Sequence, residues 1–251
     1  MADERETAVN DPAYRIVGTP KFGGVLVVSD HASNLVPADI DLGIEPALLD
    51  LHIALDIGVR EVGERMAAHP GTAAFHCAVS RLVCDVNREE HVPGLIPIAS
   101  DGHAIPGNAI DHAGHEHRKA RFYHHYHHAL AALLDKVPPG LILSLHSFTP
   151  HLASHPEEHR PWQVGVVYNQ DDRAARLAIP MLEAEGLVVG DQQPYSGKLL
   201  NYTMNRHAEA EGRPYLGIEI RQDEIDHAEG QARWAERLHR IANRVAIQLG
   251  S

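Results

Sequence analysis

The sequence predicts an α/β fold with a largely parallel sheet that helices cover on both faces. Short apolar runs rich in β-branched residues alternate with longer amphipathic stretches along the 251 residues. This alternation is typical of βαβ units, in which helices connect parallel strands. No internal repeat and no linker divides the chain. We therefore expect a flexible tail over residues 1–14 and a single domain over residues 15–251.

The expected elements follow each other in a simple order, and glycine and proline residues bound most of them. The expected strands are residues 23–30, 72–79, 140–146, 163–169 and 215–221. The expected helices are residues 45–69, 111–137, 171–185 and 222–249. Pro180 lies inside the third of these helices, where a proline can kink the axis.

The composition excludes several classes of protein. The formal net charge is −12, whereas nucleic-acid and anionic-membrane binding need a basic surface. Two cysteines, Cys77 and Cys84, do not make a disulfide framework. The polar N-terminus and the shortness of the apolar runs predict neither a signal peptide nor a membrane span. We expect a cytoplasmic protein, as a monomer or a small homo-oligomer.

The sequence contains 20 histidines, and histidine is the commonest metal ligand among side chains. One hypothesis is therefore a non-catalytic, histidine-rich metal-binding protein centred on residues 124–128. His124 and His128 are helical neighbours. The row stops there, because Arg121 stands one turn after His117. A solvated helix face explains this cluster better than a metal site does.

Polar residues gather at the carboxyl ends of the expected strands, where ligands bind in this class of fold. They are Asp30 and His31 after the first strand, Arg81, Asn87 and Arg88 after the second, His146 and Ser147 at the end of the third, and Glu219 and Arg221 in the last. Because the strands are expected to be largely parallel, one cleft could gather these side chains.

The residue types in this set favour the hydrolysis of an amide. Two imidazoles and a carboxylate are a common ligand set for catalytic zinc, which activates water and polarises a carbonyl. A separate carboxylate can take a proton from the water and pass it to the leaving amine. Arginine binds substrate carboxylates or stabilises an oxyanion.

Six segments together resemble the N-formylglutamate amidohydrolase family. They are SDHASNLVP, SRLVCDVNR, FYHHYHHAL, SLHSFTP, YTMNRHAE and IEIRQDEI, in the family's order. The resemblance implies a zinc-carboxypeptidase-like fold, a three-layer α/β/α sandwich around a mixed sheet. It also implies hydrolysis of N-formyl-L-glutamate, a small anionic N-acyl amino acid, to formate and L-glutamate in histidine degradation. One zinc ion is the implied cofactor, although another divalent transition metal could use the same ligands.

The same mechanism could act on a different substrate. SDHASN and IEIRQDEI resemble a branch of the family whose members are mostly named by resemblance. Another N-acyl amino acid or a small peptide is therefore the alternative substrate.

The resemblance implies roles for the residues at the strand ends. His31 and His146 match positions of metal ligands, and Glu219 matches the position of the general base. Arg81 is expected to polarise the scissile carbonyl or to bind a second substrate carboxylate.

The third metal ligand departs from the carboxypeptidase pattern, which has a glutamate three residues after its first histidine. Asn34 stands at that spacing from His31 and is a poor zinc ligand. Asp56 is the preferred ligand, since it lies on an otherwise apolar helical face where a carboxylate should have a partner. Asp30 is the alternative.

Several further residues are candidates for substrate binding. They are Asn87, Arg88, Ser147, His127, Tyr202, Arg206 and Arg221. Asn87 and Arg88 match the family's pair that holds a substrate carboxylate, and His127 matches a histidine of the family. Tyr202 and Arg206 belong to residues 196–207, a segment that could close over substrate as a lid.

Overall fold

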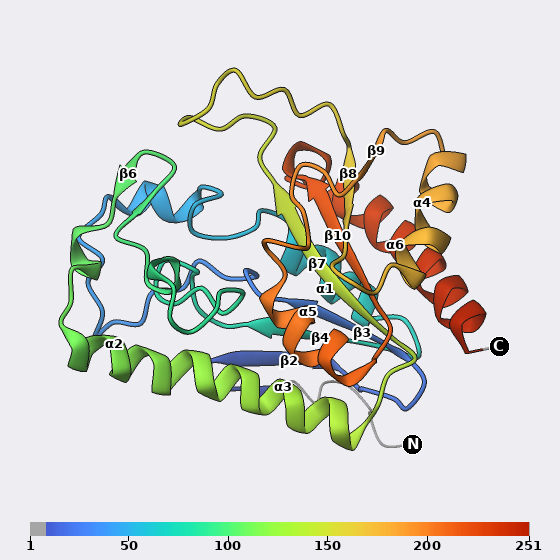
Figure 1. The fold of residues 1–251 in the computed structure, drawn as a ribbon, viewed down its shortest axis with the longest axis horizontal. Helices are drawn as coiled ribbons and strands as arrows, with labels where there is room; N and C mark the ends of the chain where they lie inside the picture. Colours follow the sequence, from blue (N-terminus) through green and yellow to red (C-terminus); the bar gives the residue numbers. More distant parts are fainter. Residues whose placement is uncertain (1–8, 251) are drawn as a thin grey trace.

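The computed structural model describes residues 9–250 and shows one mixed sheet between two layers of helices (Figure 1). Among these residues the main sheet has eight strands in the order β1-β2-β4-β3-β7-β10-β8-β9. They are β1 Val9–Asn10, β2 Tyr14–Gly18, β3 Val25–Ser29, β4 Thr72–Cys77, β7 Leu141–Phe148, β8 Val164–Val167, β9 Val189–Asp191 and β10 Tyr215–Arg221. The central strands β4, β3, β7 and β10 run parallel, while β2 and β8 pair antiparallel with β4 and β10.

Helices cover both faces, so the predicted three-layer α/β/α sandwich is confirmed. On one face lie α1 Val59–Ala67, α4 Arg173–Ala184 and α6 Ala228–Leu249. On the other lie α2 His112–Arg118, a π-helical stretch Lys119–His124, α3 His125–Lys136 and α5 Tyr202–His207. Figure 1 shows α2 and α3 as one long green helix along a side of the sheet, away from α4 and α6.

The remaining described elements are short. The 3-10 helices are Pro46–Asp50, Pro93–Leu95, Pro106–Asn108, Glu209–Glu211 and Gln222–Glu224. A small hairpin pairs β5 Ala99–Ser100 with β6 His103–Ala104. No helix within residues 9–250 combines the length and the apolar character that crossing a bilayer requires.

The central strands are apolar on both sides because both sides are covered. Val25 and Val27 of β3 pack into the core that contains α1, α4 and α6, whereas Leu26 and Val28 pack toward α3. Every residue of β3, β4 and β7 is buried. The near-continuous apolar runs that predicted these strands are therefore the signature of a sheet with two cores.

The prediction of one long helix over residues 45–69 is wrong. The segment starts with the 3-10 helix Pro46–Asp50, continues as turns over residues 51–58, and becomes α-helical only at Val59. The apolar residues of this segment do recur with helical spacing, but only the nine residues Val59–Ala67 form an α-helix.

Tertiary contacts explain why the helix does not start earlier. Gly58, directly before α1, has a φ of 78° and packs so tightly that a Cβ would collide with the carbonyl oxygen of Ile225. The amide of Asp56 donates to the carbonyl oxygen of His31 at 2.9 Å, where a helix would direct it to a residue one turn earlier. Asp56 therefore lies in a turn against the end of β3.

Other differences concern the edges of the sheet. Strands β1, β2 and β9 were not among the expected ones, and all three lie at or next to a sheet edge. Residues 1–8 of the expected tail lie outside the described residues. The rest of that segment joins the fold, since Val9–Asn10 pair with β2 and Ala13 is buried. Helix α4 continues through Pro180.

Candidate active site

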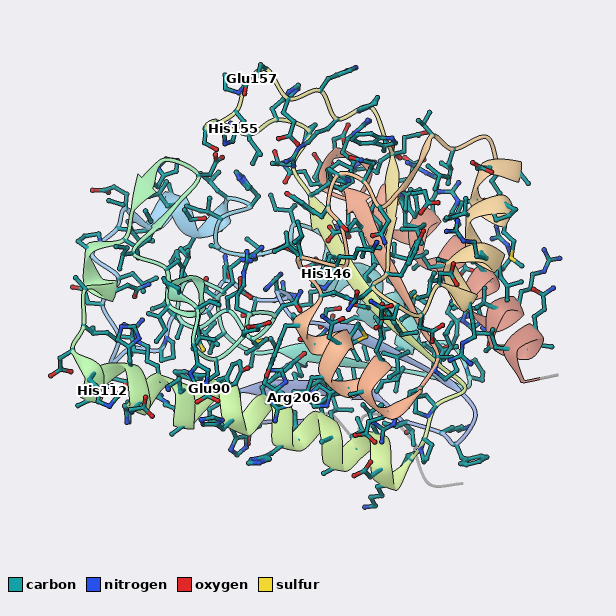
Figure 2. The ribbon with its side chains drawn as sticks, in the orientation of Figure 1. Glu90, His112, His146, His155, Glu157 and Arg206 are labelled. Carbon is teal, nitrogen blue, oxygen red and sulfur yellow. The ribbon has the colours of Figure 1, made fainter. Side chains whose placement is uncertain are left out.

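A cavity opens at the carboxyl edge of the parallel strands, and three of them supply its central side chains. His31 follows β3, His146 lies on β7 and Glu219 lies on β10. The cavity is lined by His31, His52, Asp56, Arg81, Asp85, Asn87, Arg88, His146, Ser147, Phe148, Thr149, Tyr195, Leu200 and Glu219. Figure 2 shows His146 in the middle of the molecule, far from the histidines His112 and His155 at its rim.

His31, His146 and Asp56 form a buried cluster with the composition of a metal site. The Nδ1 atoms of His31 and His146 lie 3.3 and 2.9 Å from the same oxygen, Oδ2 of Asp56. One nitrogen or oxygen from each residue lies within 4.8 Å of the others. Two imidazole nitrogens and a carboxylate oxygen suit zinc and neighbouring transition metals.

The second nitrogen of each imidazole faces another buried carboxylate. Nε2 of His31 lies 2.8 Å from Oδ1 of Asp85, and Nε2 of His146 lies 3.5 Å from Oδ2 of Asp30. Histidines that bind metals usually donate their other ring nitrogen to a carboxylate or a carbonyl. This arrangement leaves the Nδ1 atoms of both histidines available to bind a cation. Together with the carboxylate of Asp56 they form a ligand set that suits a transition-metal ion.

The two alternative third ligands occupy other places. Asp30 lies on the far side of His146, and its Oδ1 accepts hydrogen bonds from the hydroxyls of Tyr126 at 2.7 Å and Thr203 at 2.9 Å. Asn34 donates to Asp50 in an exposed pair. The geometry therefore favours Asp56, although it sits in a turn and not on the expected helical face.

Glu219 stands beside this cluster, with one carboxyl oxygen that no described residue hydrogen-bonds. It is the Cα partner of His146 across the β7–β10 ladder. It is buried, and within the described residues its Oε2 atom has no partner. Burial raises the pKa of Glu219 to about 7, against the opposing effect of His146. A carboxyl that titrates near neutrality can take up and release a proton at physiological pH.

Two arginines flank the cluster, held by Asp85. Arg81 donates to Oδ2 of Asp85 at 2.9 Å and to Oδ1 of Asp56 at 3.3 Å. Nε of Arg88 lies 3.5 Å from Asp85. Burial alone would raise the pKa of Asp85, but His31 and Arg81 hold it well below its usual value. The arginines are thus fixed by a permanent anion at the wall of the cavity.

Asn87 and Ser147 also line the cavity, with parts of both side chains held by the protein. The side-chain oxygen of Asn87 accepts from the amide of Thr203 at 3.0 Å. Ser147 donates from its hydroxyl to the carbonyl of Ile57 at 3.0 Å, and its amide lies 3.4 Å from Asp56. Ser147 therefore steadies the turn that carries Asp56.

Four candidates for substrate binding do not line the cavity. His127 is buried behind it and lies 2.9 Å from Nε2 of His207 and 3.0 Å from the carbonyl of Val86. Arg206 donates to the hydroxyl of Tyr202 at 3.2 Å in an exposed pair. Arg221 binds Asp223 and the carbonyls of residues 161 and 162. Figure 2 shows Arg206 close to the long helix, away from His146.

The buried pair His127 and His207 should make the protein sensitive to acid. Burial and the positively charged neighbours lower the pKa of His127 to about 3 and of His207 to about 4. In the unfolded chain both titrate near 6.5, so the unfolded state binds more protons as the pH falls below that value. Each such histidine then costs about 1.4 kcal/mol of stability per pH unit.

We expect the free energy of unfolding of the His127→Gln variant to fall less than that of the wild type between pH 7 and pH 5. Urea denaturation at a series of pH values measures this difference. His128→Gln, at the exposed neighbouring position, is the matched control and should follow the wild type. Equal acid sensitivity of wild type and His127→Gln would contradict the assignment.

Some residues of the cavity escaped the sequence analysis. Asp85 is one of them, although a carboxylate between Cys84 and Val86, both apolar and buried, is a signal of a buried polar role. His52 and Tyr195 gave no such signal. They come from irregular segments, where the direction of a side chain depends on contacts with distant residues.

The fold and this cavity together define an α/β protein with a candidate metal site at the carboxyl edge of its sheet. The chain belongs to the N-formylglutamate amidohydrolase family, since a sequence model of that family matches residues 23–225. This confirms the resemblance found in the sequence motifs.

Solved structures share the fold of this chain. The gene product Atu2144 from Agrobacterium tumefaciens is 27% identical, with a TM-score of 0.88 over 95% of this chain and 96% of that chain. An N-formylglutamate amidohydrolase from Ralstonia eutropha JMP134 has the same fold, with 20% identity and a TM-score of 0.72 over 95% of this chain and 98% of that chain. Among curated proteins the sequence has no match.

Proposed function

We propose that the protein is a zinc-dependent amidohydrolase that cleaves N-acyl acidic amino acids, with N-formyl-L-glutamate as substrate. One observation carries the proposal. The Nδ1 atoms of His31 and His146 and a carboxylate oxygen of Asp56 converge next to Glu219, a buried carboxyl whose pKa is raised to about 7. Membership of the family supports the reaction type.

Each residue of the site has a separate role in the proposed hydrolysis of the amide. Zinc held by His31, His146 and Asp56 would supply Lewis-acid activation of water and of the acyl carbonyl. Glu219 takes the proton of the attacking water on its carboxylate and delivers it to the amine nitrogen as the amide bond breaks. Arg81, next to Asp56, is placed to stabilise negative charge on the acyl oxygen.

The two arginines at the wall of the cavity support an anionic substrate. Arg88 and Asn87 lie together at that wall, and a guanidinium can bind a carboxylate through two parallel hydrogen bonds. The chain as a whole carries a net charge of −12, so a small dianion would be drawn to this local site and not to the surface in general.

The arrangement of the other histidines does not favour a metal-storage role. Within the described residues, His31, Asp56 and His146 are the group that could hold a metal. His124 lies 3.5 Å from Glu90 and His125 lies 3.1 Å from Asp11, while His127 is buried. Residues 124–128 thus point to separate partners.

The test combines metal analysis with a panel of substrates. We expect about one zinc per chain, hydrolysis of N-formyl-L-glutamate, loss of activity with a chelator and recovery with added Zn²⁺. N-acetyl-L-glutamate, N-formyl-L-aspartate and N-formyl-L-leucine complete the panel. Preference for N-formyl-L-leucine would reject the acidic substrate and favour another N-acyl amino acid. Purified protein that binds no metal and cleaves none of the four would overturn the proposal.

A further inference from the structure

Tyr195 reaches the cavity because the chain before it crosses strand β8 at a glycine. A Cβ on Gly165 would collide with the carbonyl oxygen of Gln193 and would lie 3.3 Å from the Cβ of Glu219. Gly165 is also the Cα partner of Glu219 across the β8–β10 ladder. The segment that carries Tyr195 therefore packs beside the general base, and both side chains line the cavity.

Arg160 holds the phenol of Tyr195 in place. Its Nη1 atom donates to the hydroxyl oxygen of Tyr195 at 3.0 Å and to the carbonyl of Thr149 at 3.2 Å. The guanidinium carbon lies 5.2 Å from the centre of the Tyr195 ring. The Arg160 side chain is only 2% exposed, although it belongs to a largely exposed loop. The contact between Arg160 and Tyr195 is therefore a buried interaction, although the loop around Arg160 is exposed.

This contact decides what the hydroxyl of Tyr195 can do. Arginine carries only donors, so the Tyr195 oxygen must be the acceptor in the pair. The phenolic proton is then left for another partner. Within residues 9–250, the hydrogen bond from Arg160 is the one that Tyr195 makes, so none of these residues supplies an acceptor for that proton.

A second arginine–tyrosine pair in the same molecule shows the contrast. Arg176 donates to the hydroxyl of Tyr168 at 2.7 Å and lies 5.3 Å from its ring. There the hydroxyl donates in turn to Asp191 at 2.7 Å. Tyr168 lies outside the cavity and has both partners, whereas Tyr195 lines the cavity and has no acceptor among the described residues.

The phenol of Tyr195 also keeps its proton at neutral pH. Burial and the nearby carboxyl of Glu219 raise the pKa of Tyr195, and Arg160 offsets only part of this. Tyr195 can therefore act as a hydrogen-bond donor and not as a base.

We infer that Tyr195, held by Arg160, donates a hydrogen bond to the acyl oxygen of the substrate at the carbon that is attacked. This inference rests on the proposed amide hydrolysis. Glu219 works at that carbon, and Tyr195 is its neighbour. Negative charge develops on the acyl oxygen as the amide is attacked, so a fixed donor contributes most at that atom. Arg160 is a positioning residue, since it acts through Tyr195.

The Tyr195→Phe variant should lower kcat for N-formyl-L-glutamate about 100-fold and change KM less than about threefold, as expected for a contact made mainly in the transition state. Tyr168→Phe removes an arginine-paired hydroxyl outside the cavity and should leave both constants unchanged. A rise in KM at constant kcat would overturn the assignment to the acyl oxygen. Unchanged constants would overturn any role in the reaction.

A double-mutant cycle tests the part of Arg160. Arg160→Met should slow the wild type but add little once Tyr195 is phenylalanine, and Arg160→Lys should recover part of the rate. Fully additive effects would overturn the positioning role, because a purely structural arginine would slow both backgrounds equally. A wild type that cleaves none of the panel removes the proposed function and this inference with it. An active wild type with an equally active Tyr195→Phe removes only the inference.

Discussion

The Glu219→Gln variant is expected to hydrolyse N-formyl-L-glutamate about 10³-fold more slowly than the wild type. Glutamine keeps the size of the side chain but cannot take a proton from water. The carboxyl lies buried beside His146 and has an oxygen without a partner, so no other described group replaces it at that point. Steady-state rates of both proteins at saturating substrate measure the effect.

Two controls separate lost chemistry from lost structure. The variant should bind zinc and unfold at no lower temperature than the wild type, because glutamine removes a buried carboxyl that has no hydrogen bond to lose at Oε2. Glu157→Gln, on the exposed loop labelled in Figure 2, should keep the full rate. A Glu219→Gln protein that retains more than a tenth of the wild-type kcat would rule out Glu219 as the general base.

The Asp56→Asn variant is expected to bind zinc more than about 100-fold more weakly, since even partners outside the ligand shell are worth 10- to 100-fold in affinity. The neutral amide loses the charge that faces both Nδ1 atoms. Competition with a chromogenic chelator measures the dissociation constant directly, without any turnover of substrate.

The competing ligand assignments give different results in the same assay. If Asp56 is the third ligand, Asn34→Ala should bind zinc like the wild type, and Asp30→Asn should lose only the smaller factor of an outer partner. Wild-type affinity in Asp56→Asn together with a large loss in Asp30→Asn would transfer the ligand role to Asp30.

His31, His146 and Glu219 could be picked out from the sequence because each is a polar residue in or directly after a short apolar run. A run such as residues 140–146 is buried on both faces, so its polar terminus stands out. Asp56 was predicted as a metal ligand because it was expected on an apolar face of a helix. The structure has a turn at this position, and Asp56 nevertheless lies next to His31 and His146. The underlying reason was still physical: a carboxylate among Ile53, Ala54 and Val59, all buried, needs a partner.

The residues that sequence could not assign depend on how separate segments meet. His127 belongs to a helix that packs on the far face of the sheet, and its neighbour in space, His207, is 80 positions away. Tyr195 enters the cavity only because Gly165 lets another segment approach. Neither contact produces a periodic pattern of residues in the sequence, since each joins segments that are far apart along the chain.

The pairing of His146 with Glu219 has a consequence for the evolution of such enzymes. The backbone ladder between two central strands sets the spacing of these two groups, and it is independent of the surrounding loops. The exposed loop after β7 can then diverge in sequence while the two strands keep the spacing of His146 and Glu219. Sequence changes in that loop should therefore alter which substrates enter the cavity without changing the spacing between the strands that carry His146 and Glu219.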